Sequence, residues 1–241
     1  MIIDNIINNN PSIFIDILHK YLSYKKLFYF IMSCKSLYKS KYSCKEYEKI
    51  YFTPYNKKEL LDAVNLWCNN RFIAIKQYNY IDRWNTIYIT NMDNLFYNDA
   101  YFNDDINDWI VSNVESMNFL FKNCRSFNQP LNEWNVKSVQ SMNYMFSDAT
   151  SFDQPLNNWN IQNLETAISM FYNACVFNQD LDNWNTTKLV YINHMFCYAL
   201  KFNGNINNWN THNVKYMQYL FYKCISFNKP LDKWNVSKVR N

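Results

Sequence analysis

The sequence predicts an α+β repeat protein, a solenoid of short parallel strands and short helices, preceded by a small all-α module. Three observations lead to this prediction. A Trp recurs every 25 residues, the apolar spacing changes within each repeat, and the first 52 residues lack the repeat. We therefore divide the chain into a helical module over 1–52 and a repeat region over 53–241, with a capping helix in 53–76 and 25-residue repeats in 77–241.

The repeat is defined by columns of large apolar residues that keep one spacing without an insertion. Two Phe columns begin at Phe96 and Phe102, and an aliphatic column begins at Val114. One coil orders about 25 residues and buries too little apolar surface to be stable alone, so the coils have to share one interior. The Trp column comprises Trp84, Trp109, Trp134, Trp159, Trp184, Trp209 and Trp234.

Two spacings within each repeat predict its elements. Trp134 and Val136 alternate by two residues after Leu131, where a leucine-rich repeat has its short strand. From Val139 to Ala149 the apolar residues follow steps of three and four, which predict a helical or 3₁₀ turn with one buried face. The predicted fold is therefore a leucine-rich-repeat-like solenoid.

Asparagines follow both aromatic columns. An Asn side chain carries a donor and an acceptor, so stacked copies can bond one another and the loop backbone. We expect such a ladder for the series after the second Phe column. For the series after the Trp column, a ladder and a solvated face are equal alternatives. The first series comprises Asn128, Asp153, Asn178, Asn203 and Asn228.

The repeat has a specific family resemblance. "FNQPLNEWNVKSVQSMNYMF", which begins at Phe127, resembles the repeat of the BspA-like leucine-rich surface proteins. The segment that begins at Asn56 is similar to the entry segment of that family, one helix followed by the first coil. Asn56 and Glu59 form a cap-like N-x-x-E before a helix expected over 57–69, and Trp67 is expected to pack that helix onto the first coil.

The first fifty residues have a different pattern. Asn10-Pro11 is a helix start, and apolar residues then recur at helical spacing, which predicts a three-helix module. "NNNPSIFIDILHKYLSYKKLFYFIMSCKSLYKS" resembles an F-box, which implies binding to a Skp1-like adaptor of a cullin ubiquitin ligase. The alternative is that these helices only cap the solenoid. The residues implied in adaptor binding are Pro11, Ile17, Leu18, Leu22, Leu27 and Cys34.

The sequence offers little for chemistry. The seven cysteines show no CxxC spacing and the three histidines lie in unrelated contexts, so we expect no enzyme activity, metal or cofactor.

The net charge of +4 resides in the N-terminal part and the repeats are slightly acidic, so we expect no nucleic acid. We see no signal peptide and no long apolar run, so we expect no membrane and an intracellular protein, in the host cytoplasm if the source is a large DNA virus.

The positions that vary between coils are the candidates for binding a target. Tyrosines on a rigid frame are typical anchors for protein recognition, and solvated aromatics are the alternative. We thus expect a non-enzymatic adaptor whose solenoid holds an unknown target protein. The alternative function is a self-associating scaffold that dimerises through the uncapped C-terminal end. The target-binding candidates are Tyr144, Tyr172, Tyr191, Tyr216, Tyr219 and Tyr222.

Overall fold

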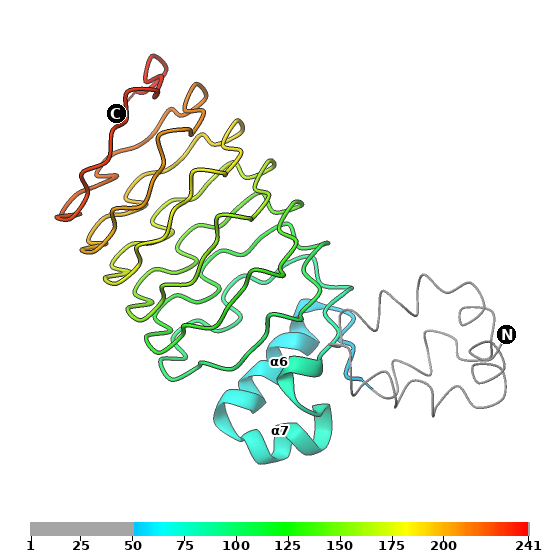
Figure 1. Cartoon of the computed structure of the whole chain (residues 1–241). Coiled ribbons are helices and arrows are strands. Elements are labelled where there is room, and N and C mark those ends of the chain that lie inside the picture. The colour runs from blue at the N-terminus through cyan, green and yellow to red at the C-terminus, as the bar shows by residue number, and fades with distance from the viewer. Residues whose placement is uncertain (1–50, 241) are drawn as a thin grey trace, which may run out of the picture.

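A computed structural model describes residues 51–240 as two helices followed by a stack of 25-residue coils (Figure 1). Helix α6 (Lys57–Asn69), helix α7 (Arg71–Tyr78) and the 3₁₀ helix η1 (Ile81–Arg83) lie at one end, and the coils run side by side from there to the C-terminal end. We number the coils from the column Trp that begins each one. Coils 1 to 6 are residues 84–108, 109–133, 134–158, 159–183, 184–208 and 209–233.

The start of α6 confirms the predicted cap. The Asn56 side chain accepts from the Glu59 N–H at 3.0 Å, and Glu59 Oε2 accepts from the Tyr55 N–H at 2.9 Å. Trp67 packs edge-on against Trp84 of coil 1, with ring centroids 5.9 Å apart. Helix α6 therefore covers the first coil as expected, whereas α7 was not predicted.

The predicted fold class, with short strands and short helices in each repeat, is wrong. Residues 51–240 contain no β-strand, and both of their α-helices precede the first coil. At the predicted strand, the Trp134 N–H donates to the Leu131 carbonyl at 3.1 Å and closes a turn. Parallel pairing occurs elsewhere, as single bridges that join Asn91, Ser116, Ser141, Thr166, Tyr191 and Tyr216 in coil order.

These bridges lie in the segment that was predicted to be helical. We call residues 91–98 and their equivalents (116–123, 141–148, 166–173, 191–198 and 216–223) the bridge segments. In coil 3, the N–H groups of Met145 and Ala149 each donate to the carbonyl three residues earlier. Tyr144 and Asp148, with φ of 57° and 60°, occupy the third position of these two turns, as in a type II turn. A left-handed residue every four residues prevents a helix from forming.

The turns leave backbone groups free to pair between coils. In coil 3, the N–H groups of Met142, Tyr144, Phe146 and Asp148 donate to carbonyls of coil 4 at 2.8–3.0 Å. Every second residue of the segment thus bonds to the next coil, and the bridge segments form one continuous face of the stack.

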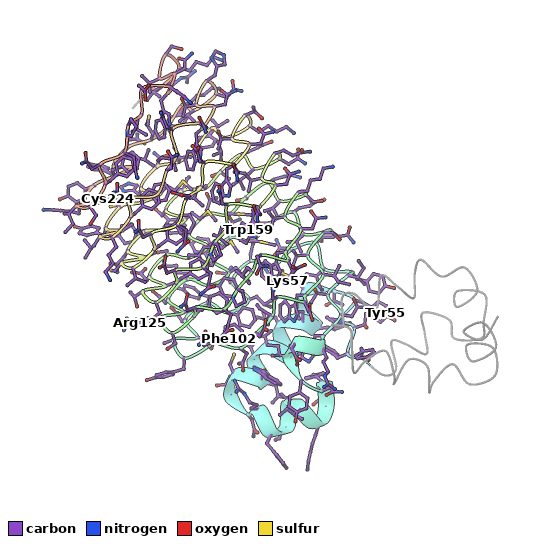
Figure 2. The ribbon with its side chains drawn as sticks, viewed as in Figure 1. Tyr55, Lys57, Phe102, Arg125, Trp159 and Cys224 are labelled. Atoms are coloured by element: carbon purple, nitrogen blue, oxygen red, sulfur yellow. The ribbon has the colours of Figure 1, made fainter. Side chains whose placement is uncertain are left out.

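The Trp and Phe columns form a continuous interior, which confirms the stacking prediction. Successive rings of the first Phe column lie 5.5 Å apart from Phe96 to Phe121 and again from Phe121 to Phe146. Each column Trp from Trp109 to Trp234 donates from Nε1 to a carbonyl 28 residues earlier, at 2.8–3.0 Å. Figure 2 shows Trp159 in the middle of the stack and Cys224 toward its C-terminal end.

The two Asn series have different roles. In the first, each side-chain oxygen accepts from the backbone N–H of its equivalent in the next coil, from Asn103 through Asn203, which confirms the ladder. In the second, the side chain accepts from the N–H two residues later in its own coil, so it stabilises a turn. These second-series side chains are exposed at Asn135, Asn160, Asn185, Asn210 and Asn235.

Candidate interaction surface

The bridge segments present two kinds of side chain. In coil 3, Met142, Met145 and Phe146 point into the interior and are fully buried. The first, third, fourth and eighth residues of the segment are partly accessible in that coil, and the seventh is partly accessible in coil 4 and exposed in coil 6. We call the surface that these five positions form the bridge face. Because the coils are in register, each position on the bridge face becomes a column along the stack.

In coils 1 to 4 the bridge face is held by a second polar ladder, which the sequence analysis did not predict. Asp93 Oδ1 accepts from the Ser116 hydroxyl at 2.6 Å and from the Asn118 N–H at 2.7 Å. Asn118 Oδ1 accepts in the same way from Ser141 and Asn143 of coil 3. The third step joins Asn143 to coil 4, where Thr166 and Ile168 are the donors.

This second ladder ends in coil 4. Ile168 occupies the ladder position and has no polar side chain to offer coil 5. Tyr191 and Tyr216 replace the hydroxyl donors of the earlier coils, and Asn193 donates through Nδ2 to Gln218. Within residues 51–240, Asn193 Oδ1 is a buried side-chain oxygen without a hydrogen-bond partner. Since leaving a buried acceptor unpaired costs free energy, the change of residue in coils 5 and 6 has a structural cost.

Tyrosines occupy the bridge face in coils 4 to 6, where the second ladder ends. The rings of Tyr191 and Tyr216 stack at 5.1 Å with 4° between their planes, and Tyr219 stacks on His194 at 5.0 Å. Tyr198 lies edge-on between Tyr172 and Tyr222, at 5.8 and 5.6 Å. We call this surface the tyrosine face: Tyr172, Tyr191, Tyr198, Tyr216, Tyr219 and Tyr222.

The tyrosine face contains five of the six tyrosines that the sequence analysis selected. Tyr144 lies apart from them, stacked on Phe119 at 4.9 Å with the Lys122 ammonium 4.9 Å above its ring. Tyr198 was missed, although it departs from a column that holds Asn or Asp in the four preceding coils. The six residues assigned to adaptor binding, from Pro11 to Cys34, lie outside the described residues.

The tyrosine face combines exposed aromatic area with a fixed backbone. Tyr219 is 61% exposed and Tyr222 46%, although Leu220 between them is buried. Tyr219 and His194 both have φ of 55°, and the His194 N–H donates to the Gln218 carbonyl at 2.8 Å, which joins coil 5 to coil 6 beside these rings. Burial raises the pKa of the Tyr172 phenol, which like any tyrosine is protonated at neutral pH and can donate a hydrogen bond.

A separate pocket of about 310 Å³ lies between the helices and coil 1. Cys68, Arg71 and Asp99 are among its lining residues, and Arg71 forms an ion pair with Asp104 at 2.5 Å. Burial raises the pKa of both the Cys68 thiol and the Asp99 carboxyl. A thiol with a raised pKa stays protonated and is a poor nucleophile, so this arrangement does not favour thiol chemistry.

The described cysteines are free thiols. Cys124 and Cys224 occupy a repeat position that holds Ala149, Ala174 and Ala199 in the coils between them. Cys124 donates to the Phe96 carbonyl at 2.9 Å, and Cys224 donates to the Ala199 carbonyl at 3.2 Å. No group of three or more His, Cys, Asp or Glu side chains in residues 51–240 could hold a metal ion. None of the helices in that range has the length and apolar character needed to cross a membrane.

These features define a repeat protein in which stacked coils share one interior and present one variable face. A family model described as "Mycoplasma protein of unknown function, DUF285" matches residues 67–182 and 163–241. Together the matches cover more than half of the chain, so the chain belongs to this family of BspA-like repeat proteins. No curated protein and no solved structure matches it.

Proposed function

We propose that this chain is a protein–protein interaction protein that holds its partner on the tyrosine face. The observation that carries the proposal is the gathering of six partly or well exposed tyrosines on one side of coils 4 to 6. Tyrosine contributes a large contact area at a small cost in side-chain entropy, and it is enriched among residues that dominate binding energy.

The rigidity of the stack supports the same proposal. Stacking between Tyr191 and Tyr216 and between His194 and Tyr219 restricts these rings before a partner arrives. Binding therefore loses less conformational entropy than it would on a flexible loop. The Phe columns beneath them keep the neighbouring coils in register.

The finer proposal concerns the N-terminal part of the chain. We propose that residues 9–45 recruit a Skp1-like adaptor, so that the coils present a bound target to a cullin ubiquitin ligase inside a cell. Its support is the F-box-like pattern, in which Leu22 and Leu27 stand where that motif has its adaptor-binding leucines.

The experiment for the tyrosine face uses the full chain with a tag, expressed in cells and treated with a short cross-linker. We expect cross-linked partner peptides on residues 166–223. Partners should be lost from Tyr219→Ser/Tyr222→Ser but kept by Tyr101→Ser, which removes an exposed tyrosine outside the tyrosine face. Partners that survive the double substitution would rule out this face as the binding surface.

The adaptor proposal is tested by pull-down with a purified Skp1-family protein. The full chain should capture it, and Leu22→Asp/Leu27→Asp should abolish capture while target cross-links to the tyrosine face persist. Absence of capture by the unmodified chain, or capture that survives the substitutions, would contradict the adaptor role and leave the tyrosine face unaffected.

Self-association is a second candidate, favoured by apolar side chains in residues 221–236. Phe221, Phe227 and Trp234 are only partly buried, and Val236 is 54% exposed. Sedimentation velocity at tens of micromolar should then show a dimer that Val236→Glu dissociates. A monomer at every concentration would contradict this candidate.

A further inference from the structure

We propose that the tyrosine face, together with the basic side chains around it, binds a short, extended, acidic segment of the partner protein. This inference rests on the proposed function and specifies the chemistry of the target. It is carried by the charge distribution along the stack, the positions of the lysines, and the point at which the second polar ladder ends.

Charge divides sharply along the stack. Residues 84–183, coils 1 to 4, carry twelve acidic and three basic side chains. Residues 184–240 carry one acidic and eight basic side chains. The small net charge of the whole repeat region conceals two regions of opposite sign. The basic side chains of the second region are Lys188, Lys201, Lys215, Lys223, Lys229, Lys233, Lys238 and Arg240.

Two of these lysines flank the tyrosine face within coil 6. Lys215 immediately precedes Tyr216, and Lys223 immediately follows Tyr222, with its ammonium 5.7 Å from the Tyr222 ring centroid. Among residues 51–240 neither lysine forms an ion pair. Their charges are available to the carboxylates of a ligand, and a charge-assisted hydrogen bond is about twice as strong as a neutral one.

The division of charge also limits the length of the ligand. At a coil spacing of ~4.8 Å, three coils span roughly 15 Å, which an extended peptide covers with about five residues. A longer anion along the stack would meet Asp148 on the bridge face of coil 3. Nucleic acid, which carries charge along its whole length, is thus disfavoured relative to a protein segment with a few acidic residues.

The end of the second ladder gives an independent indication that this face serves binding. In coils 2 to 4, Ser116, Ser141 and Thr166 complete the ladder with their hydroxyls. In coils 5 and 6 tyrosines occupy the same position, and Asn193 Oδ1 is left unpaired. A stabilising hydrogen bond is therefore absent at the place where the stacked tyrosines are present. This is expected of a binding surface, because residues at functional sites often lower the stability of the fold.

The test is fluorescence anisotropy with the full chain and a fluorescein-labelled peptide of about twelve residues in which Glu alternates with Pro, an extended sequence. We expect binding that weakens with added salt and that is lost when Gln replaces every Glu. Lys215→Glu/Lys223→Glu should weaken binding by about tenfold or more. The matched control, Arg125→Glu/Lys137→Glu, makes the same charge change in the acidic region and should change the affinity by less than about twofold.

Three outcomes would overturn the proposal: equal binding of the Gln peptide, unchanged binding by the lysine variant with a native circular dichroism spectrum, or tighter binding of oligo-dT than of the peptide. A partner cross-linked to the tyrosine face in cells would preserve the proposed function even then, because that result does not depend on the acidity of the ligand.

Discussion

Coils 1 to 4 and coils 5 and 6 share one interior and differ on the outside. Trp159 in coil 4 and Trp209 in coil 6 make the same Nε1 bond to a carbonyl 28 residues earlier, at 2.9 and 2.8 Å. Counted over all their residues, the first four coils are acidic and the last two are basic. On the bridge face, the second polar ladder joins the first four coils, whereas tyrosines cover the last two.

The comparison separates two sets of constraints in one repeat. The interior columns must keep their size and shape because each ring packs against its equivalents in the coils on either side. The bridge face contributes less to stability, so its residues can change from one coil to the next. Function in such a protein is thus to be sought where a column changes, as at Tyr191 and Tyr198.

The largest effect is expected from removal of an interior ring. Trp159→Ala should lower the free energy of unfolding by about 3–5 kcal/mol, because the side chain is almost fully buried between two coils. Trp234→Ala, at the partly buried equivalent in the last turn of the stack, should cost clearly less. Urea denaturation followed by circular dichroism measures both, and equal costs would contradict a continuous interior.

Gly204, the only glycine, provides the next comparison. A Cβ at this position would lie 2.1 Å from the Gln179 carbonyl oxygen and 2.9 Å from the Phe202 ring. Gly204→Ala should therefore cost about 1–3 kcal/mol in urea denaturation. Gln154→Ala, at the equivalent position in coil 3, should cost less than about 0.5 kcal/mol. A neutral Gly204→Ala would show that coils 4 and 5 can separate without cost.

The second polar ladder is tested by matched Asn substitutions. Asn143 accepts from the Thr166 hydroxyl and the Ile168 N–H, so Asn143→Ala should cost about 1–2 kcal/mol. Asn193 Oδ1 accepts no hydrogen bond, so Asn193→Ala should cost less. Thermal denaturation of both variants measures the difference, and the reverse order would show that this ladder does not stabilise the first coils.

The smallest expected change in stability has the clearest link to binding. Tyr216→Ser places a hydroxyl where Ser141 bonds to Asn118, so it can donate to the unpaired Asn193 Oδ1. The variant should be as stable as the parent or up to about 1 kcal/mol more stable, yet bind the acidic peptide more weakly. Tyr101→Ser should change neither quantity. A variant that loses both stability and binding would mean that Tyr216 has a structural role.

The sequence predicted which side chains are buried better than it predicted the backbone conformation. Trp134, Val136 and Val139 are all buried as expected, but the segments 131–134 and 136–139 are turns. Apolar residues spaced by three and four positions fit a helix and a series of i→i+3 turns equally well. The deciding feature is the left-handed residue at Tyr144, and an aromatic side chain gives no signal for positive φ. The cap at Asn56 was predictable because its chemistry is local.

The candidate surface was predicted in part for the same reason. Variation within a column identified Tyr191, Tyr216, Tyr219 and Tyr222, and the structure places them on one face. The second polar ladder and its end could not be predicted, because they depend on which residues of successive coils meet. The charge division was present in the sequence, but it was hidden when charges were summed over all coils.

The measurement that tests the central claim most directly is photo-cross-linking of the full chain with a benzophenone-labelled version of the Glu-Pro peptide, followed by mapping of the attachment sites by mass spectrometry. All coils present a bridge face of the same geometry, so the result depends on side chains alone. We predict attachment within the bridge segments of coils 4 to 6, at residues 166–223. Attachment in the bridge segments of coils 1 to 3, or at equal levels along the stack, would contradict the account.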